Sequence, residues 1–124
     1  MSDTAATILV VDDDEFTAEL TGMIVESAGY DVTIAVGGME ALEKIAADPA
    51  IGMVVSDMNM PFIDGIQLFA ELRGQGFKQP FLLLTGEDAE PLRLAHPDMD
   101  AVLTKDGNLQ DVLPELIESL LSRS

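Results

Sequence analysis

Residues 51–65 read IGMVVSDMNMPFIDG, and this stretch decides the fold. Its first part, Ile51–Ser56, is a short apolar run, which predicts a strand buried on both faces of a sheet. The strand ends in a carboxylate, Asp57. Beyond the stretch, apolar residues with helical spacing predict an amphipathic helix: Ile66, Phe69 and Leu72.

The same alternation of apolar runs and amphipathic stretches continues in both directions. Short apolar runs predict further strands at residues 8–11, 30–35, 81–84 and 101–104. Apolar residues with helical spacing predict the buried faces of two helices in the first half of the chain. These residues are Phe16, Leu20, Met23 and Ile24 in the first helix, which Gly29 closes, and Met39, Leu42, Ile45 and Ala46 in the second.

Prolines shape the two last predicted helices. Pro91 and Pro97 leave room for at most a short fourth helix between residues 87 and 100. The fifth helix has two alternative starts. Either Asn108 caps a helix that kinks at Pro114, or the helix begins near Asp111 with the proline in its first turn.

Five strands alternating with helices through short connections predict an α/β fold. Its sheet is parallel and doubly wound, with helices on both faces. The chain contains no long linker or internal repeat, so we expect residues 1–124 to form a single domain. In such a sheet, ligand sites lie at the carboxyl ends of the strands.

Composition narrows the function further. The 124 residues include 23 Asp and Glu but only 6 Lys and Arg, which gives a formal net charge of −17. This charge repels phosphate backbones and argues against nucleic-acid binding. The chain has no cysteine, which excludes disulfides and thiolate chemistry. Its apolar runs are too short to span a bilayer, so we expect a cytoplasmic protein without membrane contact.

Polar residues follow four of the predicted strands. Asp12 and Asp13 follow the first strand, Asp57 the third, Thr85 the fourth and Lys105 the fifth. Each residue alone is typical of a solvated loop, a turn or a cap, but their coincidence at one edge of a sheet favours a site. Two carboxylates about 4 Å apart repel by roughly 4 kcal/mol. A raised pKa, a bound cation or the lysine ammonium can each compensate this repulsion.

The residue types at these strand ends suit phosphate chemistry. Carboxylates without histidine or cysteine suit Mg²⁺ or Mn²⁺. The hydroxyl of Thr85 and the ammonium of Lys105 can neutralise the oxygens of a transferred phosphoryl group. A carboxylate can itself accept that group and form an acyl phosphate.

Four motifs in this order resemble the receiver domain of two-component response regulators. They are Val10–Asp14, Asp57–Gly65, Leu84–Gly86 and Leu103–Lys105, and the resemblance covers roughly Thr7 to Leu121. It implies a flavodoxin-like (βα)5 fold with the strand order 2-1-3-4-5. The prolines noted above would shorten its fourth helix.

The resemblance also implies a role for each candidate residue. Asp57 would accept a phosphoryl group from a phosphohistidine on a sensor histidine kinase or a histidine phosphotransfer protein. Asp13 and Asp57 would bind Mg²⁺ directly, Asp12 through water, and Asn59 through its backbone carbonyl. Thr85 and Lys105 would contact the phosphoryl oxygens and couple them to a conformational switch.

By this resemblance the protein is a phosphoacceptor in signalling rather than an enzyme, and it passes its signal to a protein partner. The sequence departs from the family pattern at the output side. Asp106 replaces the usual proline after Lys105, and Val102 replaces the usual aromatic switch residue. No output domain follows the last helix, so we expect a stand-alone receiver. Receivers often dimerise through the face of the fourth helix, fifth strand and fifth helix, which leaves a homodimer open.

Two other functions stay open at this point. One is a receiver-like interaction module that works without phosphorylation. The other is a phosphatase of the haloacid dehalogenase type with Asp12 as the nucleophile. Against it, no acidic pair on a further strand follows Lys105, and Phe16 stands where that family has Thr or Val. A nucleotide or flavin site is disfavoured because no glycine-rich loop follows the first strand.

Overall fold

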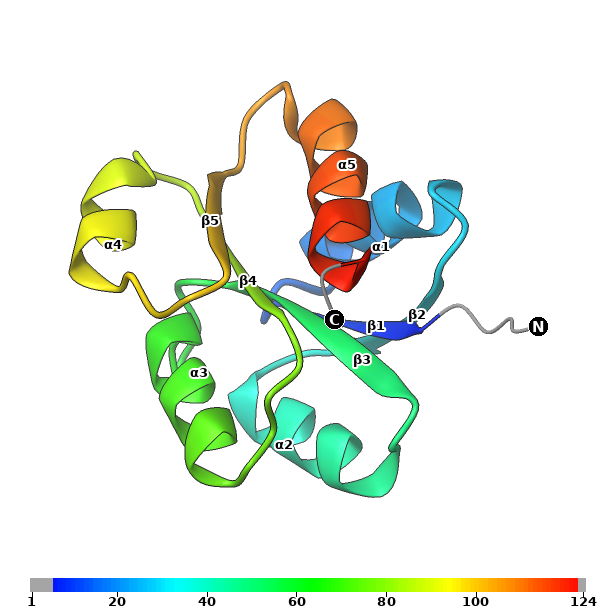
Figure 1. The fold of residues 1–124 in the computed structure, drawn as a ribbon, viewed down its shortest axis with the longest axis vertical. Helices are drawn as coiled ribbons and strands as arrows, with labels where there is room; N and C mark the ends of the chain where they lie inside the picture. Colours follow the sequence, from blue (N-terminus) through cyan, green and yellow to red (C-terminus); the bar gives the residue numbers. More distant parts are fainter. Residues whose placement is uncertain (1–5, 123–124) are drawn as a thin grey trace.

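The computed structural model describes residues 6–122, which form a five-stranded parallel sheet with helices on both faces (Figure 1). The strand order is β2-β1-β3-β4-β5, which confirms the predicted doubly wound fold. The strands are β1 (Thr7–Val11), β2 (Asp31–Ala35), β3 (Ile51–Asp57), β4 (Phe81–Thr85) and β5 (Ala101–Thr104). The helices are α1 (Glu15–Ser27), α2 (Gly38–Ala47), α3 (Gly65–Gly74), α4 (Glu90–Ala95) and α5 (Leu109–Ser122).

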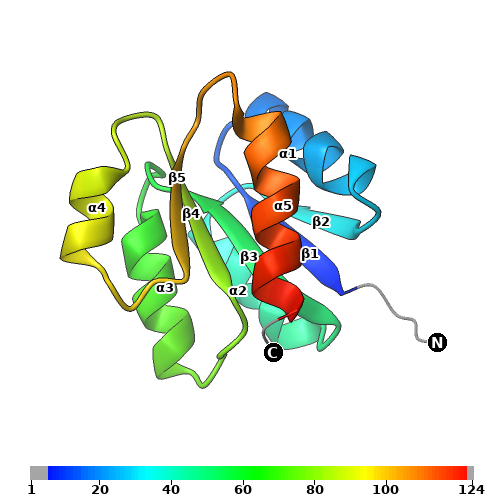
Figure 2. The same cartoon turned by 45° about the horizontal axis from the view of Figure 1, so that its top comes forward.

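Successive residues along a strand point to opposite faces of the sheet and belong to two separate hydrophobic clusters. On one face, Ile8 and Val10 of β1 pack with residues of α1 and α5. On the other face, Leu9 and Val11 pack with residues of α2 and α3. Figure 2 shows α1 and α5 on one side of the sheet and the remaining helices on the other. Because both faces are covered, the central strands read as continuous apolar runs.

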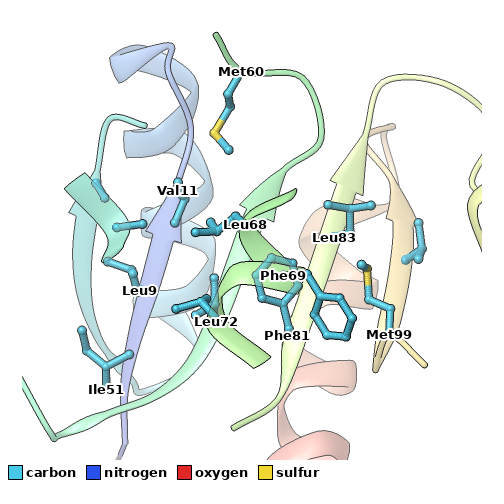
Figure 3. Close-up of a cluster of buried hydrophobic side chains, with 14 of the residues drawn as sticks. Leu9, Val11, Ile51, Met60, Leu68, Phe69, Leu72, Phe81, Leu83 and Met99 are labelled. Atoms are coloured by element: carbon cyan, nitrogen blue, oxygen red, sulfur yellow. The ribbon is translucent and has the colours of Figure 1, made fainter. Parts of the chain in front are cut away.

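The cluster under α2 and α3 contains the two buried aromatic rings of the core (Figure 3). The rings of Phe69 and Phe81 meet edge to face with their centroids 5.2 Å apart. The guanidinium carbon of Arg73 lies 4.8 Å from the Phe69 centroid, and the same side chain pairs with Asp100 at 3.0 Å. These contacts fix α3, which follows the loop after Asp57.

Helix α1 corrects one prediction from the sequence. Phe16, Leu20 and Met23, expected on its buried face, have exposed fractions of 46% to 68%. The residues that face the sheet are smaller: Ala18, Thr21, Gly22 and Val25. A Cβ on Gly22 would lie 3.4 Å from Cγ1 of Val32, so the small residues let the helix lie close against β2. In α2, Met39 and Ala46 are likewise exposed rather than buried.

The structure answers both questions that the prolines raised about α4 and α5. Helix α4 has 6 residues, which confirms a short fourth helix. Helix α5 begins at Leu109, since the amides of Asp111 and Val112 both donate to the carbonyl of Asn108. Pro114 therefore lies inside the helix and not in its first turn. Within residues 6–122, no helix is long and apolar enough to cross a membrane.

Candidate functional site

The carboxyl ends of the strands bring three aspartates together. In the register of β1 and β3, Val11 pairs with Ser56, which places Asp12 beside Asp57. Asp13 follows in the same loop, and one carboxylate oxygen from each of the three residues lies within 4.8 Å of the others. Asp12 and Asp57 are 4% and 8% exposed, whereas Asp13 faces solvent. We call this cluster of three carboxylates, which is open to solvent at Asp13, the acidic pocket.

Lys105 enters this pocket from the end of β5. Its Nζ lies 2.7 Å from Oδ1 of Asp57 and 3.8 Å from Oδ2 of Asp12. Its backbone amide donates to the carbonyl of Thr85 at 2.7 Å, which anchors the lysine to β4. The peptide bond between Lys105 and Asp106 is trans. One ammonium faces three carboxylates, so the pocket keeps an excess of negative charge.

The pKa of Asp12 reflects its burial next to other negative charges. Burial raises its pKa above the usual value of 3.8, and the charges of Asp57 and Asp13 raise it further. The amide of Asp14 and the charge of Lys105 oppose this rise without cancelling it. Folding therefore makes Asp12 harder to ionise than a solvent-exposed aspartate, which is the expected response of a buried acid among like charges.

The three consecutive aspartates have different tasks. The amide of Asp14 donates to Oδ1 of Asp12 at 2.9 Å and holds that carboxylate in place. The side chain of Asp14 instead caps α1, accepting from the Phe16 amide at 3.2 Å and the Thr17 hydroxyl at 2.7 Å. A carboxylate at a helix N-terminus stabilises the helix. Asp14 is therefore engaged outside the pocket, which weakens the phosphatase hypothesis.

The loop after Asp57 is closed by tight backbone contacts. The amide of Gly65 donates to the carbonyl of Met58 at 2.8 Å. A Cβ on Gly65 would lie 2.6 Å from the carbonyl oxygen of Asp57, so only glycine fits here. Asp64 and Gln67 form a reciprocal capping box at the start of α3. These contacts fix the backbone that presents the Asp57 carboxylate.

Thr85 ends β4 at the same edge of the sheet. Leu84 pairs with Asp57 in the register, so Thr85 lies one residue beyond Asp57 on the neighbouring strand. The side chain of Thr85 is buried, and its hydroxyl accepts from the amide of Glu87 at 3.1 Å. The threonine thus joins the edge of the site to the loop between β4 and α4.

A second threonine, which the sequence interpretation did not single out, holds the same loop. The hydroxyl of Thr104 donates to the carbonyl of Glu87 and accepts from the amide of Ala89, both at 3.1 Å. The backbone of Glu87 is therefore hydrogen-bonded to Thr85 through its amide and to Thr104 through its carbonyl. The signal available in the sequence was a hydroxyl residue directly before the lysine at the end of a strand.

The acidic pocket suits Mg²⁺ in both chemistry and size. All three side chains offer oxygen, the ligand type that Mg²⁺ prefers. With metal–oxygen distances of about 2.1 Å, opposite ligands of an octahedral ion lie roughly 4.2 Å apart. The spread of 4.8 Å or less among the three oxygens is close to this distance. Asn59 lies two residues after Asp57 in the loop, and its carbonyl as a further ligand stays a prediction.

Comparison of the sequence with known protein families gives one clear match. The sequence model described as the response regulator receiver domain matches residues 8–117. Response regulator MprA of Mycobacterium tuberculosis (strain H37Rv) is 38% identical over 118 residues. The alignment covers 94% of this chain but 47% of that protein. The chain thus spans about half the length of the curated relatives it matches.

Solved structures with the same fold are also receiver domains or response regulators. The receiver domain of Francisella response regulator 1452 matches with a TM-score of 0.85 and 31% identity, covering 95% of this chain and 98% of that one. The response regulator TrrA of Thermotoga maritima, in complex with Mg²⁺-BeF, matches with a TM-score of 0.83 and 30% identity. That match covers 93% of this chain and 98% of TrrA.

Proposed function

The chain belongs to the family of response regulator receiver domains, and on this basis we propose that it accepts a phosphoryl group on Asp57. The donor is a phosphohistidine of a sensor histidine kinase or a phosphotransfer protein. Phosphorylation switches the conformation of the loop between β4 and α4, and a protein partner reads this change.

The observation that carries this proposal is the placement of the Asp57 carboxylate. It is buried, it lies at a strand end among two further carboxylates, and a lysine ammonium contacts it at 2.7 Å. In the proposed reaction one of its oxygens attacks the phosphorus, and the bond from phosphorus to the histidine nitrogen breaks. The imidazole leaves and Asp57 becomes an acyl phosphate. Lys105 and Thr85 then contact the phosphoryl oxygens and offset their charge.

The donor set supports Mg²⁺ as the cofactor of this reaction. Asp13 and Asp57 would hold the ion directly, Asp12 through a water, and Asn59 through its carbonyl. When bound, Mg²⁺ supplies positive charge to both the carboxylates and the phosphoryl oxygens. The similar structure of TrrA was solved in complex with Mg²⁺-BeF, which supports the same ion here.

The hydrogen bonds around Glu87 support a route for the conformational switch. A new phosphoryl group on Asp57 draws the Thr85 hydroxyl toward its oxygens, at the expense of the bond from the Glu87 amide. The loop then changes its position relative to Thr104, which holds it from β5. Val102, at the position of the usual aromatic residue, is buried and packs in the core. The proposed signal therefore travels through the loop and not through a rotating ring.

A protein donor fits the surface next to the pocket. Helix α1 starts directly after the loop of Asp12, Asp13 and Asp14. It exposes the apolar side chains of Phe16, Leu20 and Met23. A groove of about 540 Å³ lies beside the last two of these, between α1 and Gln110 of α5. Exposed apolar side chains beside a reactive group are typical of a protein interface.

The test is the intact mass after incubation with Mg²⁺ and acetyl phosphate. We expect one added phosphoryl group on the wild-type chain and none on Asp57→Asn. Asp31→Asn, at the opposite end of the sheet, is the matched control and should react like wild type. An adduct on Asp57→Asn would place the acceptor elsewhere. If the wild-type chain gains no phosphoryl group from acetyl phosphate or from an autophosphorylated kinase, the interaction-module function replaces this proposal.

A further inference from the structure

The loop between β3 and α3 carries an unusual residue, Phe62. Its φ angle is 70°, in the left-handed region, where glycine and asparagine are favoured and a bulky residue is rare. Its side chain is 96% exposed, so packing within the chain does not compensate the backbone conformation. A strained residue with a fully exposed aromatic ring suggests that the ring serves something outside this chain.

The ring forms one wall of an apolar groove between two loops at the carboxyl edge of the sheet. Pro61 and Phe62 come from the loop after β3, Val36 comes from the segment that joins β2 to α2, and Met39 comes from the first turn of α2. The groove has a volume of about 230 Å³. Val36, Met39 and Phe62 are all exposed, so they form one apolar surface, which we name the Phe62 groove.

The Phe62 groove is held in shape by contacts behind it. A Cβ on Gly38 would lie 2.8 Å from Cβ of Ile63, so the start of α2 packs directly on the loop after β3. The amide of Val36 donates to Oε1 of Glu40 at 3.0 Å, which fixes the other wall. A preformed groove binds a partner at a lower entropic cost than a flexible one.

The groove lies close to the phosphoacceptor. Phe62 precedes Gly65 by three residues, so their Cα atoms are at most about 11 Å apart. Gly65 in turn is in contact with the backbone of Asp57. A standard protein interface buries about 800 Å² on each partner, a patch with a radius of roughly 16 Å. A protein that reaches Asp57 over such an area therefore also covers Phe62.

We propose that the Phe62 groove docks the protein that donates the phosphoryl group. This inference rests on the proposed function of Asp57. The docking segment of the donor carries a large apolar side chain for the groove, with Lys or Arg beside it. The net charge of −17 and the carboxylate of Glu40, which lines the groove, favour such a basic segment. The same charge disfavours a second copy of this chain as the occupant.

The test compares a small donor with a protein donor. Phe62→Asn keeps the left-handed conformation accessible and removes the ring, so it should fold at least as stably as wild type in urea. We expect unchanged phosphorylation by acetyl phosphate and about ten-fold slower transfer from a protein donor. That donor is the most active one for wild type in a panel of purified, autophosphorylated histidine kinases and phosphotransfer proteins.

Two further variants sharpen the comparison. Phe62→Tyr keeps the ring and should restore transfer from the protein donor. Leu94→Asn changes another exposed apolar residue, which lies on α4, and should leave both reactions unchanged.

Each remaining outcome separates the two proposals. Unchanged transfer from the protein donor in Phe62→Asn would overturn the docking role and leave the proposed function intact. Equal slowing with both donors would also overturn it, because Phe62 would then act on the acceptor itself. A wild-type chain that neither acetyl phosphate nor any panel member phosphorylates would remove the proposed function, and with it this inference.

Discussion

Replacing Asp12 by asparagine should stabilise the metal-free protein at pH 7. Asparagine has nearly the same shape, and its side-chain oxygen can still accept from the amide of Asp14. What it removes is a buried charge that the folded state disfavours, since burial and two neighbouring carboxylates raise the pKa of Asp12. We expect a gain of about 1–2 kcal/mol in the free energy of unfolding.

The magnitude follows from the distances in the pocket. Two unit charges 4.8 Å apart, the upper limit of the separation between one oxygen from each of the three carboxylates, repel by about 3.5 kcal/mol at an effective dielectric near 20. Asp12 has two such neighbours, and at 3.8 Å from Lys105 it gains an attraction of about 4 kcal/mol. Repulsion thus exceeds attraction by roughly 3 kcal/mol, and water at the exposed Asp13 reduces this difference.

The stabilisation should depend on pH with a defined sign. Because the pKa of Asp12 is raised in the folded state, its contribution to stability is complete below its usual value of 3.8 and is lost as the pH rises through the raised value. Asparagine stays neutral throughout. The advantage of Asp12→Asn should therefore be largest near pH 7 and disappear at pH values below the usual pKa.

The assay is urea unfolding in EDTA, followed by far-UV circular dichroism because the chain has no Trp and one Tyr. Asp31→Asn, an exposed aspartate at the start of β2, serves as the control and should change stability little. Addition of Mg²⁺ should reverse the order, since wild type gains about 2.7 kcal/mol at 100 times its dissociation constant. A metal-free Asp12→Asn protein no more stable than wild type at pH 7 would refute the electrostatic reasoning.

Three further changes test other parts of the site. Gly65→Ala should lower the free energy of unfolding by about 1–3 kcal/mol, because the added methyl would lie 2.6 Å from the Asp57 carbonyl; an unchanged urea midpoint would show that the loop can move aside. Thr104→Val removes two hydrogen bonds and should speed amide hydrogen exchange at residues 86–89, whereas Thr104→Ser should not; equal exchange in both variants would argue against the threonine as an anchor. Asp13→Ala should weaken Mg²⁺ binding at least about ten-fold by isothermal titration calorimetry, and full retention of affinity would remove it from the ligand set.

The sequence by itself determined the order of the elements and the edge on which the candidate residues meet. Short apolar runs separated by amphipathic stretches leave a parallel sheet as the way to bury both faces. In a parallel sheet all carboxyl ends lie at one edge, so Asp12, Asp57, Thr85 and Lys105 had to gather there. Their grouping therefore followed from strand direction alone.

Tertiary packing decided which surfaces stay open. The spacing of Phe16, Leu20 and Met23 was correctly helical, yet these side chains face outward because Ala18 and Gly22 let α1 lie closer to the sheet. Periodicity counts apolar residues along one helix. It contains no information on how closely the opposing strand approaches, which depends on small residues on both elements.

Tertiary structure also decided the finer geometry of the site. The reach of Lys105 to Asp57 spans 48 residues of sequence, and the hydroxyl of Thr104 meets a loop that precedes it by 15 to 17 residues. The exposure and backbone strain of Phe62 depend on how the loop after β3 packs against α2. Sequence patterns fix which residues reach an edge of a sheet, whereas contacts between distant segments fix the distances, and the chemistry depends on those distances.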